Sequence, residues 1–339
     1  MTNLQVDSKR CAIVAGNGPS LREIDYTRLP PPPHSSCKAS FDINNYDIFR
    51  CNQFYFEDKY YLGKKVKFAF TIPAFLFEHY YTHRTLTYME EYEIDDIVVS
   101  NLDFTHIDLL YLQHSLMYDD VICGSRQLFK LKDFYTFVRY NHLYHDRLIT
   151  SGIYVCAFAV ALGYKEVYIA GIDLYSAKET YAFDTMQKNL LTIAPYFSAI
   201  PGECNASHTK ELDIEALYFL EKHYGVKFYS ICPNSPINEY IPLAPKQNNA
   251  NFQIEERKKN SIKDMLIPPI AAYEKLNHGI DLKLQHNPLD YTKEIRRYKQ
   301  TLRDNSIYKL YKDIIKLPKA IYHYIKGCRL SKRLKEDIG

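Results

Sequence analysis

Residues 12–21 read AIVAGNGPSL, and this stretch indicates the fold. An apolar run ends in the turn GNGPS (residues 16–20) and continues into a predicted helix, which is the order of a first β-strand, a tight turn and a helix N-terminus. Glycine lets the backbone approach a ligand closely, and the N–H groups at a helix start favour an anion. We therefore expect a nucleotide or a sugar phosphate at this turn, although a strand–turn–helix unit without a ligand would have the same pattern.

Leu21 occupies the position of the third glycine in a dinucleotide-binding fingerprint. The turn is therefore not a G-x-G-x-x-G sequence. This difference argues against an NAD-dependent oxidoreductase, which is one alternative for a chain that begins with such a unit.

Further apolar, β-rich runs alternate with helical patterns along the chain. This alternation predicts an α/β fold, with a Rossmann-like, mostly parallel seven-stranded sheet and helices on both faces. The expected strands are residues 11–15, 47–52, 66–71, 96–101, 121–124, 166–170 and 227–231, and the strongest helical patterns are 151–162 and 211–223. Ligands of such sheets bind beyond the carboxyl ends of the strands. We therefore expect four segments to lie near one another: the 16–20 turn, Asn52-Gln53, Thr150-Ser151 and Gly171-Ile172-Asp173.

The predicted Rossmann-type domain spans residues 1–245. Within it, residues 174–211 interrupt the alternation after a strand end, which indicates a lid or another binding loop, with disorder as the alternative. Residues 246–292 are irregular and polar, and are expected to wrap the domain or to link it to a basic tail at 293–339.

The composition is that of a globular protein: 46% of the 339 residues are hydrophobic, with 31 Tyr and no Trp. None of the eight cysteines forms a C-x-x-C pair, so we expect thiols of a reducing compartment rather than a disulfide or zinc framework. Residues 1–10 are polar and do not have the pattern of a signal peptide. No run approaches the roughly 20 apolar residues of a membrane span.

The net charge of +3 conceals an asymmetry. Residues 293–339 hold nine Lys and five Arg against five acidic residues, a net +9, so the rest of the chain carries −6. Between residues 307 and 325 apolar and aromatic side chains recur with Lys between them, a pattern typical of segments that lie on anionic membranes. A helix docked on the domain, or an oligomer contact, is the alternative. No nucleic-acid motif accompanies the tail, so nucleic acid is not an expected partner.

Several segments together are similar to one family. They are residues 15–20 (AGNGPS), 50–63 (RCNQFYFEDKYYLG), 149–152 (ITSG), 161–165 (ALGYK), 171–173 (GID) and 207–210 (SHTK). The chain resembles the bacterial lipooligosaccharide sialyltransferases of glycosyltransferase family 42, typified by the Campylobacter enzymes.

The resemblance implies an inverting transfer of sialic acid from CMP-sialic acid (CMP-Neu5Ac) to a terminal galactose, with α2,3 linkage and α2,8 extension to sialic acid as a further activity. It also implies a GT-A-like variant of the Rossmann fold with a lid, a homotetramer, and no cofactor or metal. The absence of any D-x-D sequence agrees with the last point, because a donor with one phosphate has less need of a divalent ion.

The resemblance also assigns the site. His208 matches the general base, a role that suits imidazole because it titrates near neutral pH; His142 and His145 are weaker candidates. Tyr175 and Tyr181 match two tyrosines that bind the leaving phosphate, although in a chain so rich in Tyr a packing role is the alternative. The donor-binding candidates are Asn17, Gly18, Asn52, Gln53, Thr150, Ser151, Gly152, Gly171 and Asp173.

Three of these donor-binding candidates have a second interpretation. Asn17 lies between two glycines and tolerates left-handed backbone, so it has a possible role in shaping the turn only. Gln53 faces either the sugar or the solvent. Asp173 either orients the ribose or caps the following turn.

Three positions depart from the family pattern. Leu148 stands where relatives have a basic residue, and Arg147 is its candidate replacement. Ile72 and Asn205 stand where relatives carry residues linked to the acceptor side, so acceptor and linkage stay open.

We thus expect a peripheral enzyme on the cytoplasmic face of a bacterial membrane. The alternatives are a glycosyltransferase that uses another CMP-nonulosonate, and a non-catalytic nucleotide-binding or membrane scaffold.

Overall fold

The computed structural model describes residues 11–31, 41–100, 120–175, 181–183, 208–257 and 264–269, with shorter pieces at 189, 262, 272, 310–311, 314–319, 321–322 and 324–326. The chain divides into two compact units, Met1–Ile270 and Ala271–Gly339. The fold described below is that of the first unit.

A seven-stranded sheet forms the centre of this unit, in the order β6-β5-β4-β2-β1-β7-β8. Its strands are β1 (Ala12–Ala15), β2 (Asp47–Cys51), β4 (Lys65–Thr71), β5 (Glu93–Val99), β6 (Val121–Cys123), β7 (Glu166–Ala170) and β8 (Lys227–Ser230). Every pair in the sheet is parallel. The strand order reverses at β1, which lies between β2 and β7, and this is where open α/β sheets bind their ligands.

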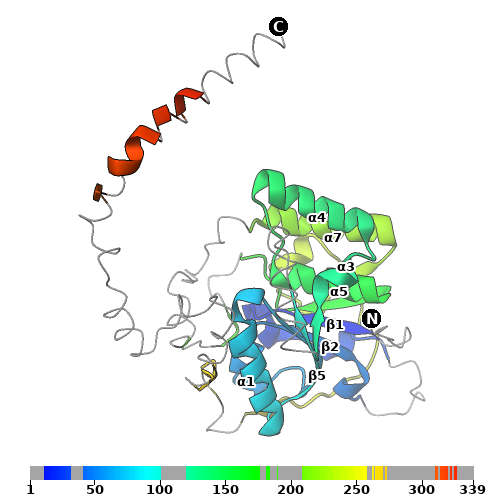
Figure 1. Cartoon of the computed structure of the whole chain (residues 1–339). Coiled ribbons are helices and arrows are strands. Elements are labelled where there is room, and N and C mark those ends of the chain that lie inside the picture. The colour runs from blue at the N-terminus through cyan, green and yellow to red at the C-terminus, as the bar shows by residue number, and fades with distance from the viewer. Residues whose placement is uncertain are drawn as a thin grey trace. The chain divides into compact units, whose positions relative to one another are not determined.

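Helices cover both faces of the sheet (Figure 1). On one side lie α3 (Gly124–Leu128), α4 (Lys132–His145), α5 (Ser151–Leu162) and α7 (Lys210–Tyr224), and on the other lies α1 (Leu76–Tyr88). Alternate residues of β1 enter the two cores: Ala12 and Val14 pack toward α5, while Ile13 and Ala15 pack on the opposite face. Because both faces are buried, β1 is apolar throughout, and β4 and β5 contain the apolar runs Phe68–Phe70 and Ile97–Val99 near their carboxyl ends.

The predicted α/β class and parallel sheet are confirmed. The strand predicted at residues 166–170 coincides with β7, and the helix predicted at 151–162 coincides with α5. Among the described cysteines, Cys51, Cys123, Cys156 and Cys232 are buried free thiols, as expected.

We expected a regular helix directly after the first turn, and this expectation was wrong. Residues Pro19–Glu23 form a short 3-10 helix, and Ile24 is already extended. The helix does not continue, because the N–H of Asp25 donates to the carbonyl of Ile231, just beyond β8, at 2.9 Å. The long helix whose N-terminus reaches the ligand-binding edge is therefore α5.

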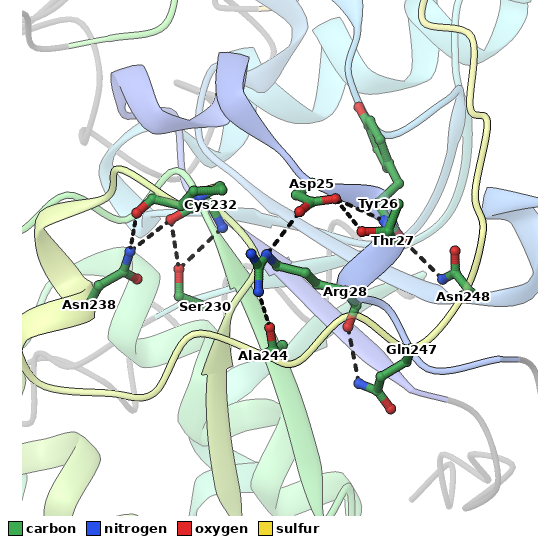
Figure 2. Close-up of polar contacts among 11 residues, drawn as sticks. Asp25, Tyr26, Thr27, Arg28, Ser230, Cys232, Asn238, Ala244, Gln247 and Asn248 are labelled. Atoms are coloured by element: carbon green, nitrogen blue, oxygen red, sulfur yellow. Dashed lines mark hydrogen bonds and ion pairs between the residues drawn. The ribbon is translucent and has the colours of Figure 1, made fainter.

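Residues 244–248 return to a second 3-10 helix, Tyr26–Arg28, which follows the first one (Figure 2). The N–H of Gln247 donates to the carbonyl of Thr27 at 2.7 Å, and the side-chain amide of Asn248 donates to the carbonyl of Tyr26 at 3.0 Å. Further along, β9 (Glu255–Glu256) pairs antiparallel with β3 (Lys59–Tyr60). The chain beyond β8 therefore packs against the first unit at least as far as β9. The predicted boundary at residue 245 stays a prediction.

Candidate active site

The turns after β1 and β7 pack directly against each other. The N–H of Gly18 donates to the carbonyl of Gly171 at 2.8 Å. A Cβ atom on Gly16 would lie 2.3 Å from that same carbonyl oxygen, and Gly171 itself has a φ of 62°. These glycines are thus required where two backbone turns approach each other, which is a constraint distinct from contact with a ligand.

Asp173 uses both carboxylate oxygens inside the protein. Its Oδ2 accepts the N–H of Ser20 at 2.9 Å, and its Oδ1 accepts the hydroxyl of Ser235 at 2.7 Å. These contacts hold the 3-10 helix after β1 in place, and neither is to the turn that follows Asp173. Its contact with a ribose stays a prediction.

Asn17 and Asn52 lie at the carboxyl ends of neighbouring strands. The Asn17 side-chain amide donates to the carbonyl of Cys51 at 3.1 Å, whereas its Oδ1 is buried without a hydrogen-bond partner. Asn52 follows β2 with a φ of 53°, and its side-chain amide donates to Ser151 Oγ at 3.3 Å. The orphaned amide oxygen of Asn17 is an acceptor that a bound ligand can satisfy, since unsatisfied buried polar atoms are rare in native proteins.

The N-terminus of α5 closes the same region. Thr150 is its N-cap, yet the Thr150 side chain makes no capping bond to the helix. The first-turn N–H groups therefore have no side-chain cap and are oriented to receive an anion. A Cβ atom on Gly152 would lie 2.8 Å from Ile172 Cδ1, so a small residue is needed where α5 meets the turn after β7. Gln53 is buried at the start of the 3-10 helix Phe54–Phe56.

His208 lies just before α7 and is bound to the segment that precedes α5. It forms a parallel bridge with Leu148, and its Nδ1 is 2.9 Å from the Leu148 carbonyl oxygen. A carbonyl oxygen only accepts hydrogen bonds, so Nδ1 carries the proton. In the neutral ring Nε2 is then the nitrogen with a lone pair, which is the form that a general base requires.

Arg147 also reaches the start of α7. Its Nη2 is 3.5 Å from Thr209 Oγ1 and 3.7 Å from Glu215 Oε1, and its Nη1 is 3.4 Å from Asn141 Oδ1. The guanidinium therefore lies beside the residue that follows His208. Its role at the acceptor side stays a prediction.

The residues that open the predicted lid have unusual backbone. Leu174 and Tyr175 both have positive φ, 51° and 57°, a left-handed conformation that costs non-glycine residues of order 1 kcal/mol each. Tyr175 is 41% exposed. These two consecutive strained residues lie directly after Asp173, at the start of the predicted lid.

Residues 181–183 return to the first turn. The N–H of Ala182 donates to the Asn17 carbonyl at 2.8 Å, and Arg22 donates to the Ala182 carbonyl. Tyr181 is half-buried and stacks on Phe183. Tyr181 thus directly precedes a residue that is bonded to Asn17. The phosphate-binding role of Tyr175 and Tyr181 stays a prediction.

The remaining predicted positions are less informative. Ile72 is half-buried at the start of the 3-10 helix Pro73–Phe75, and His142 and His145 lie in the last turn of α4. Asn205 and most of the predicted lid lie outside the described residues.

Asp213 was not predicted. This buried residue of α7 accepts both the N–H and the hydroxyl of Thr150, each at 2.8 Å. An acidic residue in the first turn of a helix is expected on dipole grounds alone, so no sequence signal distinguished Asp213.

A parallel sheet whose carboxyl edge holds an uncapped helix start, with a histidine bonded to the segment before that helix, suits an enzyme that acts on a nucleotide substrate. The chain matches the family model described as alpha-2,3-sialyltransferase (CST-I) over residues 10–328, and it belongs to this family. It is therefore a sialyltransferase, as the sequence resemblance implied.

Similar proteins agree with this assignment. The sialyltransferase CstII from Campylobacter jejuni, solved with the substrate analogue CMP-3FNeuAc, is 45% identical with a TM-score of 0.72, covering 80% of this chain and 100% of that one. CstII has also been solved with a trisaccharide acceptor and CMP. The monofunctional alpha-2,3-sialyltransferase Cst-I from Campylobacter jejuni is 38% identical with a TM-score of 0.73, covering 84% and 98%. An uncharacterized protein of Haemophilus influenzae is 40% identical over 241 residues, 70% of this chain and 95% of that protein.

Proposed function

We propose that this sialyltransferase transfers sialic acid from CMP-sialic acid to a terminal galactose of a lipooligosaccharide-type acceptor, with inversion and without a metal ion. The observation that carries the proposal is the bond between His208 Nδ1 and the carbonyl of Leu148, a residue two positions before Thr150, because this bond leaves Nε2 with its lone pair as the proton acceptor. The CMP, CMP-3FNeuAc and trisaccharide bound to CstII support the same donor and acceptor classes.

The chemistry follows from these groups. His208 Nε2 takes the proton of the acceptor hydroxyl as that oxygen bonds to the anomeric carbon. The bond from the anomeric carbon to the phosphate oxygen breaks on the opposite face, and CMP leaves with the electron pair. Tyr175 and Tyr181 are proposed to donate hydrogen bonds to the departing phosphate, where charge develops. The N-terminus of α5, Asn17 and Asn52 are proposed to hold the donor.

The experiment that tests this proposal measures CMP release from CMP-Neu5Ac in EDTA, with and without lactose. We expect release that lactose stimulates, and NMR of the product should show an α2,3 linkage, with α2,8 extension tested on sialyllactose. Tight CMP binding without release on any galactoside would instead favour another CMP-nonulosonate donor. If release also fails with other nonulosonates, a binding-only scaffold is favoured.

The C-terminal unit supports a proposed location at an anionic membrane surface. Its described residues between 310 and 326 are helical, and their large apolar side chains are exposed: Leu310, Tyr311, Ile314, Ile315, Leu317, Ile321, Tyr322, Tyr324 and Ile325. Within the described part of the chain, no helix is long and apolar enough to cross a membrane. The location on the cytoplasmic face and the homotetramer remain proposals based on the tail and on the family resemblance.

Deleting residues 293–339 should abolish sedimentation with vesicles of phosphatidylcholine and phosphatidylglycerol. The full chain should bind these vesicles, should bind pure phosphatidylcholine far less, and should be released by salt, because each Lys or Arg near the surface adds about 1 kcal/mol of screened attraction. Equal sedimentation of the full and shortened chains would contradict a membrane role for the tail.

A further inference from the structure

Asp213 is a buried carboxylate that contacts the site through Thr150. It is 1% exposed, and both of its oxygens are taken by the two donors of Thr150. Among the described residues, no Lys, Arg or His lies within ion-pair distance of it. The titratable group that faces it from α5 is the buried thiol of Cys156, whose pKa is raised by burial and by the charge of Asp213.

The bond to Asp213 determines where the Thr150 hydroxyl points, and this affects the N-terminus of α5. A threonine at an N-cap ordinarily accepts a hydrogen bond from an N–H in the first turn of its own helix. Here the hydroxyl is turned to Asp213, and no such capping bond forms. The first-turn N–H groups of α5 therefore stay available, next to Asn52, which bonds Ser151.

The same carboxylate joins the two segments of the site. Leu148 and Thr150 lie before α5, and His208 and Asp213 lie at the start of α7. The Leu148 carbonyl holds the His208 ring, while Asp213 holds Thr150. Two attachments between two short segments prevent one from sliding or rotating along the other, so the distance from the base to the α5 N-terminus is fixed.

We propose that Asp213 is a positioning residue of the transfer reaction. Its carboxylate holds both donors of Thr150, which keeps the α5 N-terminus open to the sugar nucleotide and fixes the helix that follows His208 against it. The inference deepens the function proposed above and rests on it.

The energetics favour positioning over a purely structural role. Burial raises the pKa of Asp213 to about 7. Because an unfolded aspartic acid titrates near 4, this group reduces folding stability as the pH rises from about 4 to about 7, and the cost persists above pH 7. A buried carboxylate that lowers folding stability above pH 7 agrees with an orienting role for its two bonds to Thr150.

Asp213→Asn separates the two roles. The amide can accept the Thr150 N–H and donate to Thr150 Oγ, but it no longer binds the hydroxyl hydrogen. We expect kcat/KM for CMP-Neu5Ac to fall about 10- to 100-fold, the range found when partners that orient a site residue are removed. The melting temperature at pH 8 should stay equal or rise. Glu211→Gln, an exposed carboxylate in the same helical turn, should change neither quantity.

Variants of Thr150 form the second part of this experiment. Thr150→Val removes the hydroxyl and should reproduce the loss, with little further loss in the Asp213→Asn, Thr150→Val double variant. Thr150→Ser keeps both donors and should be at least tenfold more active than Thr150→Val. The ratio of wild-type to Asp213→Asn affinity for CMP should also shrink as the pH falls from 8 to 6, because Asp213 then becomes protonated in the wild type.

Two results would overturn the inference: unchanged kcat/KM in Asp213→Asn, or a fall in melting temperature at pH 8 large enough to account for the lost activity. Failure of the proposed function is distinguishable, because the wild-type enzyme would then release no CMP from CMP-Neu5Ac. In that case the ratio of wild-type to Asp213→Asn affinity for CMP still tests whether Asp213 keeps the α5 N-terminus open, because the ratio should exceed one at pH 8.

Discussion

Replacing His208 with alanine should lower acceptor-stimulated transfer by about 10²- to 10⁴-fold, the usual contribution of a general base. The reason is geometric: Nδ1 is committed to the Leu148 carbonyl at 2.9 Å, so only Nε2 can take the acceptor proton. The measurement is single-turnover transfer from CMP-Neu5Ac to lactose, which separates chemistry from product release.

CMP affinity should change little in the same variant. Among the described residues, the His208 ring bonds the Leu148 carbonyl, whereas Asn17 and Asn52 bond Cys51 and Ser151, so the proposed nucleotide contacts survive its removal. His223→Ala is the matched control, because it removes an exposed imidazole from the other end of the helix that follows His208. Transfer at a near wild-type rate by His208→Ala would show that His208 is not the general base.

The strands were predictable because their chemistry is local. In a parallel sheet buried on both faces, each strand is a short apolar run, and β1 is apolar throughout. Helices were also predictable where their hydrophobic pattern was clear: α5 is apolar along almost its whole length, and α7 alternates between an apolar and a polar face. By contrast, α1 buries Glu78, His79, Thr82 and His83 between Leu76 and Leu86, so the middle of its inward face is polar and interrupts the apolar stripe. Its hydrogen bonds, such as Thr71 Oγ1 to His79 Nδ1 at 2.6 Å, exist only after folding.

The sequence predicted which residues lie at the candidate site, but not the hydrogen bonds that join them. The motif around residues 16–20 and the strand-end rule placed Asn17, Asn52 and Ser151 at one edge, and their contacts agree. The bond between Asp173 and the Ser235 hydroxyl joins residues 62 positions apart in sequence. Asp213 depended on Thr150 at 63 residues' separation. Such long-range hydrogen bonds leave no spacing that a single sequence reveals.

Replacing Arg50 with methionine should destabilise the folded protein by about 3–5 kcal/mol, the cost of leaving one partner of a buried ion pair uncompensated. Arg50 is 0% exposed, and its Nη2 donates to Glu57 Oε2 at 2.9 Å. The same carboxylate accepts the Tyr92 hydroxyl at 2.7 Å. In the variant, Glu57 would keep its charge in the core without its main cation. Urea unfolding at pH 8 measures the loss, and Lys65→Met, which breaks an exposed pair with Glu93, should cost less than about 1 kcal/mol.

Two further measurements distinguish loss of charge compensation from loss of packing. Burial already raises the pKa of Glu57, and removal of Arg50 should raise it further. A raised carboxyl pKa costs stability as the pH increases, so the deficit of Arg50→Met should be smaller at pH 5 than at pH 8. Adding Glu57→Gln to Arg50→Met should restore stability, because the neutral amide can still accept the Tyr92 hydroxyl; additive losses would contradict the ion-pair account. Arg50 and Glu57 bracket Asn52 and Gln53, so the same variant should also weaken CMP binding, which couples the buried charge pair to the donor site.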